Sequence, residues 1–84
     1  MYISTSEGVV TVGFRYDKDS KKRVVTTANV TVPGCLTPFV GQVTCSKQDH
    51  FEKEAGRKGA LARAMQPIDR FLRTQIWGGY FARK

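Results

Sequence analysis

The residues best suited to chemistry in this chain are Cys35, Cys45, Asp49 and His50. Thiolate, carboxylate and imidazole groups bind zinc, but zinc sites usually contain ligand pairs two to four residues apart, and these residues match no such signature. A cysteine and a histidine could also form a nucleophile and its base, but no third residue stands at a recognisable spacing to orient the histidine. The sequence therefore predicts no metal ion, no cofactor and no catalytic residue.

Two other patterns give no catalytic signal either. Glu52 and Glu54 point to different faces of the helix predicted around them, so they do not form a carboxylate pair. Residues 55–60, AGRKGA, fall inside the same helix and lack the long glycine-rich loop that holds phosphates in a P-loop. The two cysteines are typical of reduced, buried thiols, with a disulfide between neighbouring extended segments as the minor alternative.

The chain is strongly basic, and most of the charge lies in its C-terminal half. Its 84 residues include 14 Lys and Arg against 7 Asp and Glu, which gives a formal net charge of +7. Residues 1–42 carry +2 of this charge and residues 43–84 carry +5. A cationic surface attracts phosphate backbones, acidic proteins and anionic membranes alike. The charge therefore indicates an anionic target without identifying it.

One candidate binding face lies on the helix predicted over residues 47–65. Small side chains at Gly56, Ala60 and Ala64 are spaced four residues apart and form a ridge that lets another surface approach closely. The basic candidates on this helix are Lys53, Arg57, Lys58 and Arg63. One interpretation is a flat cationic docking face. The other is that the ridge packs against the second helix and the charges form its solvated rim.

The second predicted helix, which starts near Pro67, combines arginine with aromatic residues. Arg70, Arg73 and Trp77 fall within one narrow sector, and Tyr80 joins them if the helix continues that far. An arginine beside an exposed tryptophan is a frequent interface anchor and also suits stacking on nucleic-acid bases. The alternative is that Trp77 folds back over the sheet and completes the core.

The first half of the chain has the pattern of antiparallel strands. Apolar and polar side chains alternate over residues 9–16, and residues 23–32 are rich in β-branched types, so these two runs predict a hairpin around a polar turn. Pro33 and Gly34 end the second run. A third short strand is expected at residues 42–46, and residues 2–4 would add an edge strand.

Two helices are expected after the strands. Ser46 and Asp49 fit a capping box that begins the first helix, and Pro67 suits the first turn of the second. Gly78 and Gly79 are expected to end or fray the second helix. The expected core residues are Phe51, Ala55, Leu61, Ala62 and Met65 in the first helix, and Ile68, Phe71, Leu72 and Ile76 in the second.

Together these elements predict a single α+β domain over residues 1–84, β-rich at 1–46 and helical and basic at 47–84. Because the strands precede the helices, we expect an antiparallel sheet of three to four strands followed by two C-terminal helices packed on one face. No apolar run reaches the roughly 20 residues of a transmembrane helix, and the first residues lack the features of a signal peptide. We therefore expect an intracellular protein without a membrane partner.

Two segments of the helical half resemble a known group of proteins. The pattern S-x-x-D-x-F-x-K-x-x-G-R-K-x-A-L-x-R-A, which begins at Ser46, resembles a segment of small accessory proteins encoded by tailed bacteriophages and prophages. The pattern R-x-x-I-W-x-x-Y-F-x-R, which begins at Arg73, is similar to what often follows it there. This chain departs from that pattern at Gly78 and Gly79, where such proteins more often have helix-favouring residues. The resemblance implies a small accessory protein that works in a bacterial host cytoplasm, in host takeover or against host defence.

The main functional hypothesis is a non-enzymatic protein that binds nucleic acid or the host machinery that handles nucleic acid. In this hypothesis the Lys and Arg candidates supply charge, while Trp77 and Tyr80 stack or anchor. A second hypothesis is a protein–protein inhibitor of a host defence enzyme, with Trp77 as its hot spot. A third is a homo-oligomer that binds a small anionic signalling nucleotide in a pocket containing Arg57. The salt dependence of binding separates the first hypothesis from the second.

Overall fold

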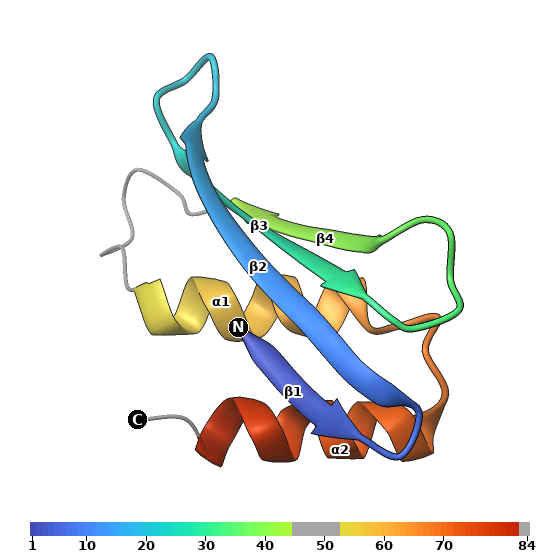
Figure 1. Ribbon diagram of the computed structural model, residues 1–84. Helices are drawn as coiled ribbons and strands as arrows, with labels where there is room; N and C mark the ends of the chain where they lie inside the picture. The colour runs from blue at the N-terminus through green and yellow to red at the C-terminus, as the bar shows by residue number, and fades with distance from the viewer. Residues whose placement is uncertain (45–52, 83–84) are drawn as a thin grey trace.

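Four strands form one antiparallel sheet in which each strand pairs with the next along the chain (Figure 1). The computed structural model describes residues 1–44 and 53–82. The strands are β1 (Tyr2–Thr5), β2 (Gly8–Lys18), β3 (Val24–Thr31) and β4 (Phe39–Thr44). All four predicted strands are therefore confirmed, although β4 begins three residues earlier than expected. The α+β fold class, with two helices after the sheet, is confirmed as well.

Short turns with local hydrogen bonds set the register of the sheet. Between β1 and β2 the chain turns over two residues, and Gly8 adopts a φ of 114°, which favours glycine. Between β2 and β3 one carboxylate oxygen of Asp19 accepts the backbone N–H groups of Lys21 and Arg23, each at 2.9 Å. The polar run expected to be a turn is thus held by its own aspartate.

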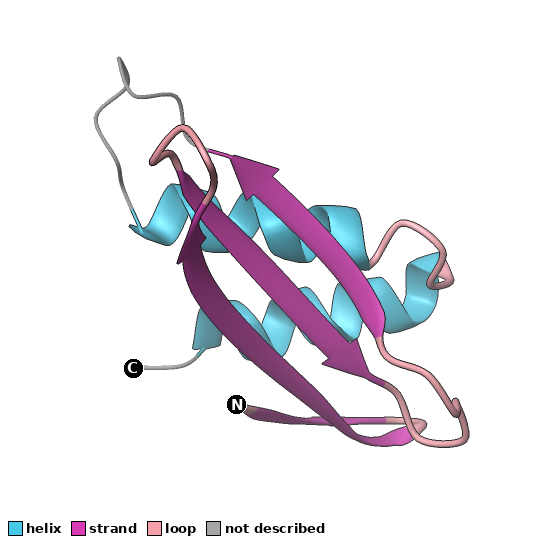
Figure 2. Cartoon of the chain, turned by 90° about the horizontal axis from the view of Figure 1, so that it is seen from above, coloured by secondary structure: helices cyan, strands magenta, loops and turns pink. Residues whose placement is uncertain are grey.

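One face of the sheet carries the core, as the alternating pattern predicts. Val10 and Val12 of β2 and Ala28 and Val30 of β3 are all buried, and their neighbours in sequence point to the opposite face. Both helices cover this same face, and they lie behind the sheet in the view of Figure 2. The other face of the sheet has no helix on it within the described residues.

Helix α1 (Lys53–Ala64) lies along β3 and β4 and packs with its small residues toward the sheet. Ala60 and Ala64 are buried, and a Cβ on Gly41 of β4 would overlap the carbonyl oxygen of Ala60 and the amide nitrogen of Ala64. The missing side chain of Gly41 therefore lets the helix backbone touch the sheet. The predicted ridge is not a docking face, and it packs on the sheet instead of on the second helix.

The core stripe expected on α1 is only partly buried. Leu61 and Met65 are buried as predicted, but Ala55 and Ala62 are exposed. Because alanine occurs on both sides of this helix, its apolar pattern does not define a face. Phe51, the remaining residue of that stripe, lies outside the described residues, as do Ser46 and Asp49 of the expected capping box and the helix start at residue 47.

Helix α2 (Arg70–Ala82) lies beneath β1 and runs straight through the two glycines (Figure 1). The helix begins at Arg70, later than Pro67 suggested, because Asp69 caps it: Oδ1 of Asp69 accepts the N–H of Phe71 at 2.8 Å. The prediction that Gly78 and Gly79 end the helix is wrong. A Cβ on Gly79 would overlap Cγ2 of Ile3, so this glycine allows β1 to approach the helix.

The structure also bears on the expected core residues around α2, on the cysteines and on membrane-spanning helices. Ile68, Leu72 and Ile76 are buried as predicted, but Phe71 is exposed. Cys35, expected to be buried, is an exposed free thiol in the β3–β4 connection, while Cys45 lies outside the described residues. Within the described ranges, no helix is long and apolar enough to span a membrane.

Candidate functional site

Arg57 lies between α1 and the sheet instead of on a free docking face. Its Nε donates a 2.6 Å hydrogen bond to the hydroxyl of Tyr16 on β2, and its Nη1 lies 3.8 Å from a carboxylate oxygen of Glu54. Its guanidinium carbon sits 5.9 Å from the centroid of the Phe14 ring. The hydrogen bond with Tyr16 raises the pKa of Arg57, so the side chain stays cationic. Arg57 thus holds α1 to the sheet, and the hypothesis of a nucleotide pocket around it gains no support.

Tyr80 is fully buried and is not available to a ligand. Its hydroxyl donates to Oε1 of Glu54 at 3.0 Å, which joins the end of α2 to the start of α1. Its ring meets the Phe14 ring edge to face, with the centroids 6.1 Å apart. The prediction that Tyr80 stacks on a target is therefore wrong. The helix does continue past the glycines, but Tyr80 follows Ile76 by four residues and lies on the same buried side of α2.

Trp77 combines the two alternatives that the sequence left open. It is half-buried and packs against the core, with its ring edge-on to Tyr80 at 5.7 Å. Its ring also lies nearly parallel to that of Phe81, with the centroids 5.4 Å apart and an interplanar angle of 17°. Phe81 is 55% exposed. Trp77 therefore packs against the ring of Phe81, and Phe81 forms the aromatic surface that is exposed to solvent.

The other predicted basic residues fall into two places. Nζ of Lys58 lies 5.4 Å from the centroid of Phe81, so this lysine borders the aromatic pair. Arg70 is exposed on the first turn of α2, and Arg73, one turn further on, is half-buried with its Nε out of solvent. Arg63 instead reaches the sheet edge, where its Nη1 donates to the backbone oxygen of Gln42 at 3.1 Å. Lys53 begins α1, and its side chain lies outside what the structure describes.

The helix surface that unites these groups is called the helical face below. Its members are Lys58 of α1 and Arg70, Arg73, Trp77 and Phe81 of α2. The contacts of Phe81 with Lys58 and Trp77 connect the two helices, and the arginines lie one turn apart beside Trp77 on α2.

Four of the described carboxylates interact with residues that do not belong to the helical face. Asp17 pairs with Arg15 at 2.9 Å, and Asp19 pairs with Arg23 at 2.8 Å, both on the β2–β3 hairpin. On the helices, Glu54 contacts Arg57 and Tyr80, and Asp69 caps α2. Among the described residues, none of these carboxylates forms an ion pair with a cation of the helical face, which therefore keeps a positive field.

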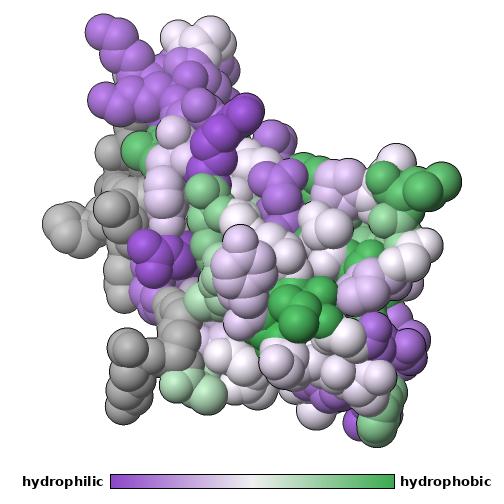
Figure 3. All heavy atoms as spheres, viewed as in Figure 1, coloured by the Kyte–Doolittle hydropathy of each residue, from purple (hydrophilic) through white to green (hydrophobic). Residues whose placement is uncertain are grey.

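Two surface features were not predicted from the sequence. Lys18, Lys21 and Lys22 are exposed around the tip of the β2–β3 hairpin, which is the strongly hydrophilic projection at the upper left of Figure 3. These lysines belong to the polar run that the sequence predicts only as a turn. Lys22 has a positive φ of 62°, which marks it as part of the tight turn.

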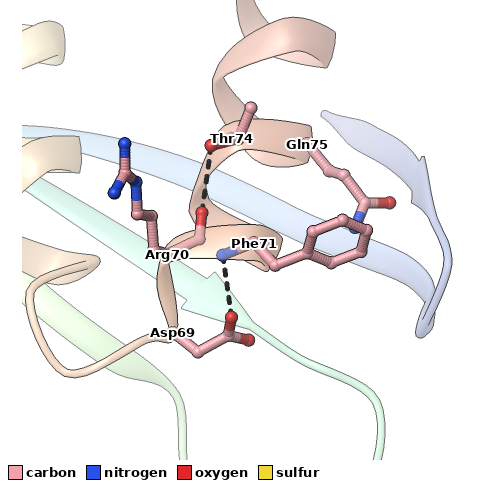
Figure 4. Close-up of a pocket in the computed structure, with 5 residues that line it drawn as sticks. All are labelled: Asp69, Arg70, Phe71, Thr74 and Gln75. Atoms are coloured by element: carbon pink, nitrogen blue, oxygen red, sulfur yellow. Dashed lines mark hydrogen bonds between the residues drawn. The ribbon is translucent and has the colours of Figure 1, made fainter.

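The second unpredicted feature is an open pocket of about 460 Å³ on the first turns of α2 (Figure 4). It is lined by Asp69, Arg70, Phe71, Thr74 and Gln75. Phe71, which the sequence predicts to lie in the core, is 68% exposed. The spacing of Leu72, Ile76 and Tyr80 is the signal that would have shown this, because a buried stripe through these residues places Phe71 on the opposite side of the helix.

Comparison of the chain with known protein-family models, with curated proteins and with solved structures finds no match. The candidate site therefore rests on the geometry of this chain alone. Of the four residues considered for a metal site, only Cys35 is described, and the described ranges contain no cluster of three or more His, Cys, Asp or Glu that could hold a metal ion.

Proposed function

We propose that this protein is a small, non-enzymatic bacteriophage accessory protein that binds nucleic acid through the helical face. The observation that carries the proposal is the exposed ring of Phe81 with Lys58 5.4 Å from its centroid, on a helix that also carries Arg70 and Arg73. None of these three cations forms an ion pair with a carboxylate among the described residues. Cations of this kind bind phosphate oxygens, and most contacts between proteins and nucleic acids are made to the phosphate and sugar backbone.

Only some of the predicted binding residues are accessible to a nucleic acid. Lys58 and Arg70 are exposed and supply charge, while Phe81, supported by Trp77, supplies an aromatic surface. Arg57 and Tyr80 do not belong to the proposed binding surface, because Arg57 links α1 to the sheet and Tyr80 links α2 to α1. Arg63 lies at the β4 edge and is peripheral to the helical face.

The proposal is tested by measuring the binding of labelled oligonucleotides by fluorescence anisotropy over a series of salt concentrations. Each lost phosphate contact should reduce the slope of log K against log salt by about 0.7 to 0.9. Lys58→Ala and Arg70→Ala should each weaken binding and flatten this slope. Lys21→Ala is the matched control, because it removes the same charge from the distant hairpin tip.

Two results would contradict the proposal. One is the absence of any oligonucleotide binding at low salt. The other is an equal effect of Lys21→Ala and Arg70→Ala, which would mean that net charge, and not the helical face, attracts the oligonucleotide. Binding to a host protein that survives both nuclease and high salt would favour the inhibitor hypothesis instead.

A further inference from the structure

The ring of Phe71 is unusual because it is a large apolar side chain that faces solvent on a well-formed helix. It is 68% exposed, although the residues one position later and five later, Leu72 and Ile76, are buried. Phe71 lines the open pocket at the start of α2, and in Figure 4 its ring projects on the same side of the helix as Gln75. The ring is therefore presented at the surface and is not part of the core.

The surroundings of this ring are held in place by hydrogen bonds. The N–H of Phe71 donates to Asp69 at 2.8 Å, which fixes the first turn of α2. The side-chain amide of Gln75 is held at both ends by Ser6: Oε1 accepts the N–H of Ser6 at 2.7 Å, and Nε2 donates to its hydroxyl at 3.0 Å. A ligand that stacks on Phe71 would contact a helix turn and a Gln75 side chain that these hydrogen bonds already order, which lowers the entropic cost of binding.

The charges around the ring suit a nucleic acid backbone. Arg70 precedes Phe71 and lines the same pocket, with its guanidinium directed away from the ring in Figure 4. Asp69 is the carboxylate of this pocket, and its interaction with the positive end of α2 offsets its charge. A base on the ring and a phosphate on Arg70 can therefore be bound by adjacent residues.

A second exposed ring lies further along the same helix. Phe81 is ten residues after Phe71, which corresponds to about 15 Å along the helix axis. Between them, Gly78 adds no side chain, and a Cβ there would meet nothing within 4 Å. The outer side of α2 thus carries two aromatic rings with Arg70 and Arg73 along the same helix.

From this arrangement we infer that the nucleic acid bound by this protein is single-stranded, with one base stacked on Phe71 and the backbone along Arg70. The inference rests on the proposed function. A duplex covers the faces of its bases by stacking them on each other, so it offers nothing to an exposed aromatic ring. A single strand offers those faces, and stacking on aromatic side chains is independent of base sequence.

The test compares one fluorescent oligonucleotide of about 12 nucleotides as a single strand and as a duplex, at equal salt. Phe71→Ala should weaken single-strand binding by about 5-fold to 150-fold, which is the range for the loss of one stacked base, and should leave duplex binding unchanged. Phe71→Tyr keeps the ring and should retain the affinity, whereas Phe71→Leu should behave like Phe71→Ala. Leu36→Ala is the control, since Leu36 is fully exposed in the β3–β4 connection.

The outcomes separate the inference from the proposed function. Tighter single-strand binding that depends on an aromatic residue at position 71 supports the inference. Duplex binding of equal or greater strength, or single-strand binding that Phe71→Ala leaves unchanged, overturns the inference and leaves the proposed function standing. If neither oligonucleotide binds, both fail. Far-UV circular dichroism of each variant confirms that the helices are retained.

Discussion

The two adjacent glycines of α2 give a sharp test of how this helix packs. Glycine in a helix interior is about 0.8–1.0 kcal/mol less favourable than alanine, so replacement by alanine should stabilise an exposed position. At Gly78 a Cβ meets nothing within 4 Å, and at Gly79 it overlaps Cγ2 of Ile3 and lies 3.1 Å from Cγ1. Gly78→Ala should therefore stabilise the protein, while Gly79→Ala should not.

The size of the difference follows from the packing around Ile3. This side chain is 4% exposed, so it has little room to move away from a new methyl group. Adding a methyl group to a packed core costs about 1–3 kcal/mol. Because the gain in helix propensity is common to both variants, it cancels, and Gly79→Ala should be less stable than Gly78→Ala by about 1–3 kcal/mol.

Urea and thermal unfolding, followed by circular dichroism, measure this difference. In a domain of this size, 1 kcal/mol corresponds to about 4–8 °C in the melting temperature. In an Ile3→Ala background the effect of Gly79→Ala should shrink, since the overlapping carbon is gone. Equal stabilisation by the two alanine substitutions would refute the contact between β1 and α2 on which this reasoning depends.

Three further predictions concern other contacts. Gly41→Ala should destabilise the fold by more than Gly79→Ala, because its methyl group would overlap the backbone of α1, which urea unfolding would show. Asp69→Ala should cost about 1 kcal/mol in the same assay, since the N–H of Phe71 loses its capping oxygen. Hydrogen bonds from Arg23 lower the pKa of Asp19, so the stability that this carboxylate contributes is present above its unfolded pKa of about 3.9 and is lost as the pH falls through the folded value. Asp19→Asn should therefore be less stable than the wild type near neutral pH, and urea titrations at decreasing pH should show that gap narrowing; a constant gap would contradict this account.

The strands were predictable because each half-buried strand shows its two faces in sequence. Val10 and Val12 are buried while Val9 is exposed, as the alternation requires. The packing face of α1 was not predictable in the same way. Its alanines occur on both sides, and the choice between them is made by the absence of a side chain at Gly41 in another element.

The candidate site was predictable in its charges but not in their partners. The sequence identified Arg57 as basic, but only the fold brings the hydroxyl of Tyr16 to it from β2. The end of α2 was mispredicted for a similar reason, because local propensity counts Gly79 as a break while its contact with Ile3 requires a glycine within the helix. In both places a long-range contact outweighs the local signal.

The pairing of β1 with α2 also bears on the order in which the chain folds. Each of the strands β2, β3 and β4 pairs with a strand already synthesised, and α1 then covers β3 and β4. The strand β1 emerges first, but the helix that lies on it, α2, emerges after every other described element. A nascent chain would thus leave the inner side of β1 open to water and to other chains until α2 docks.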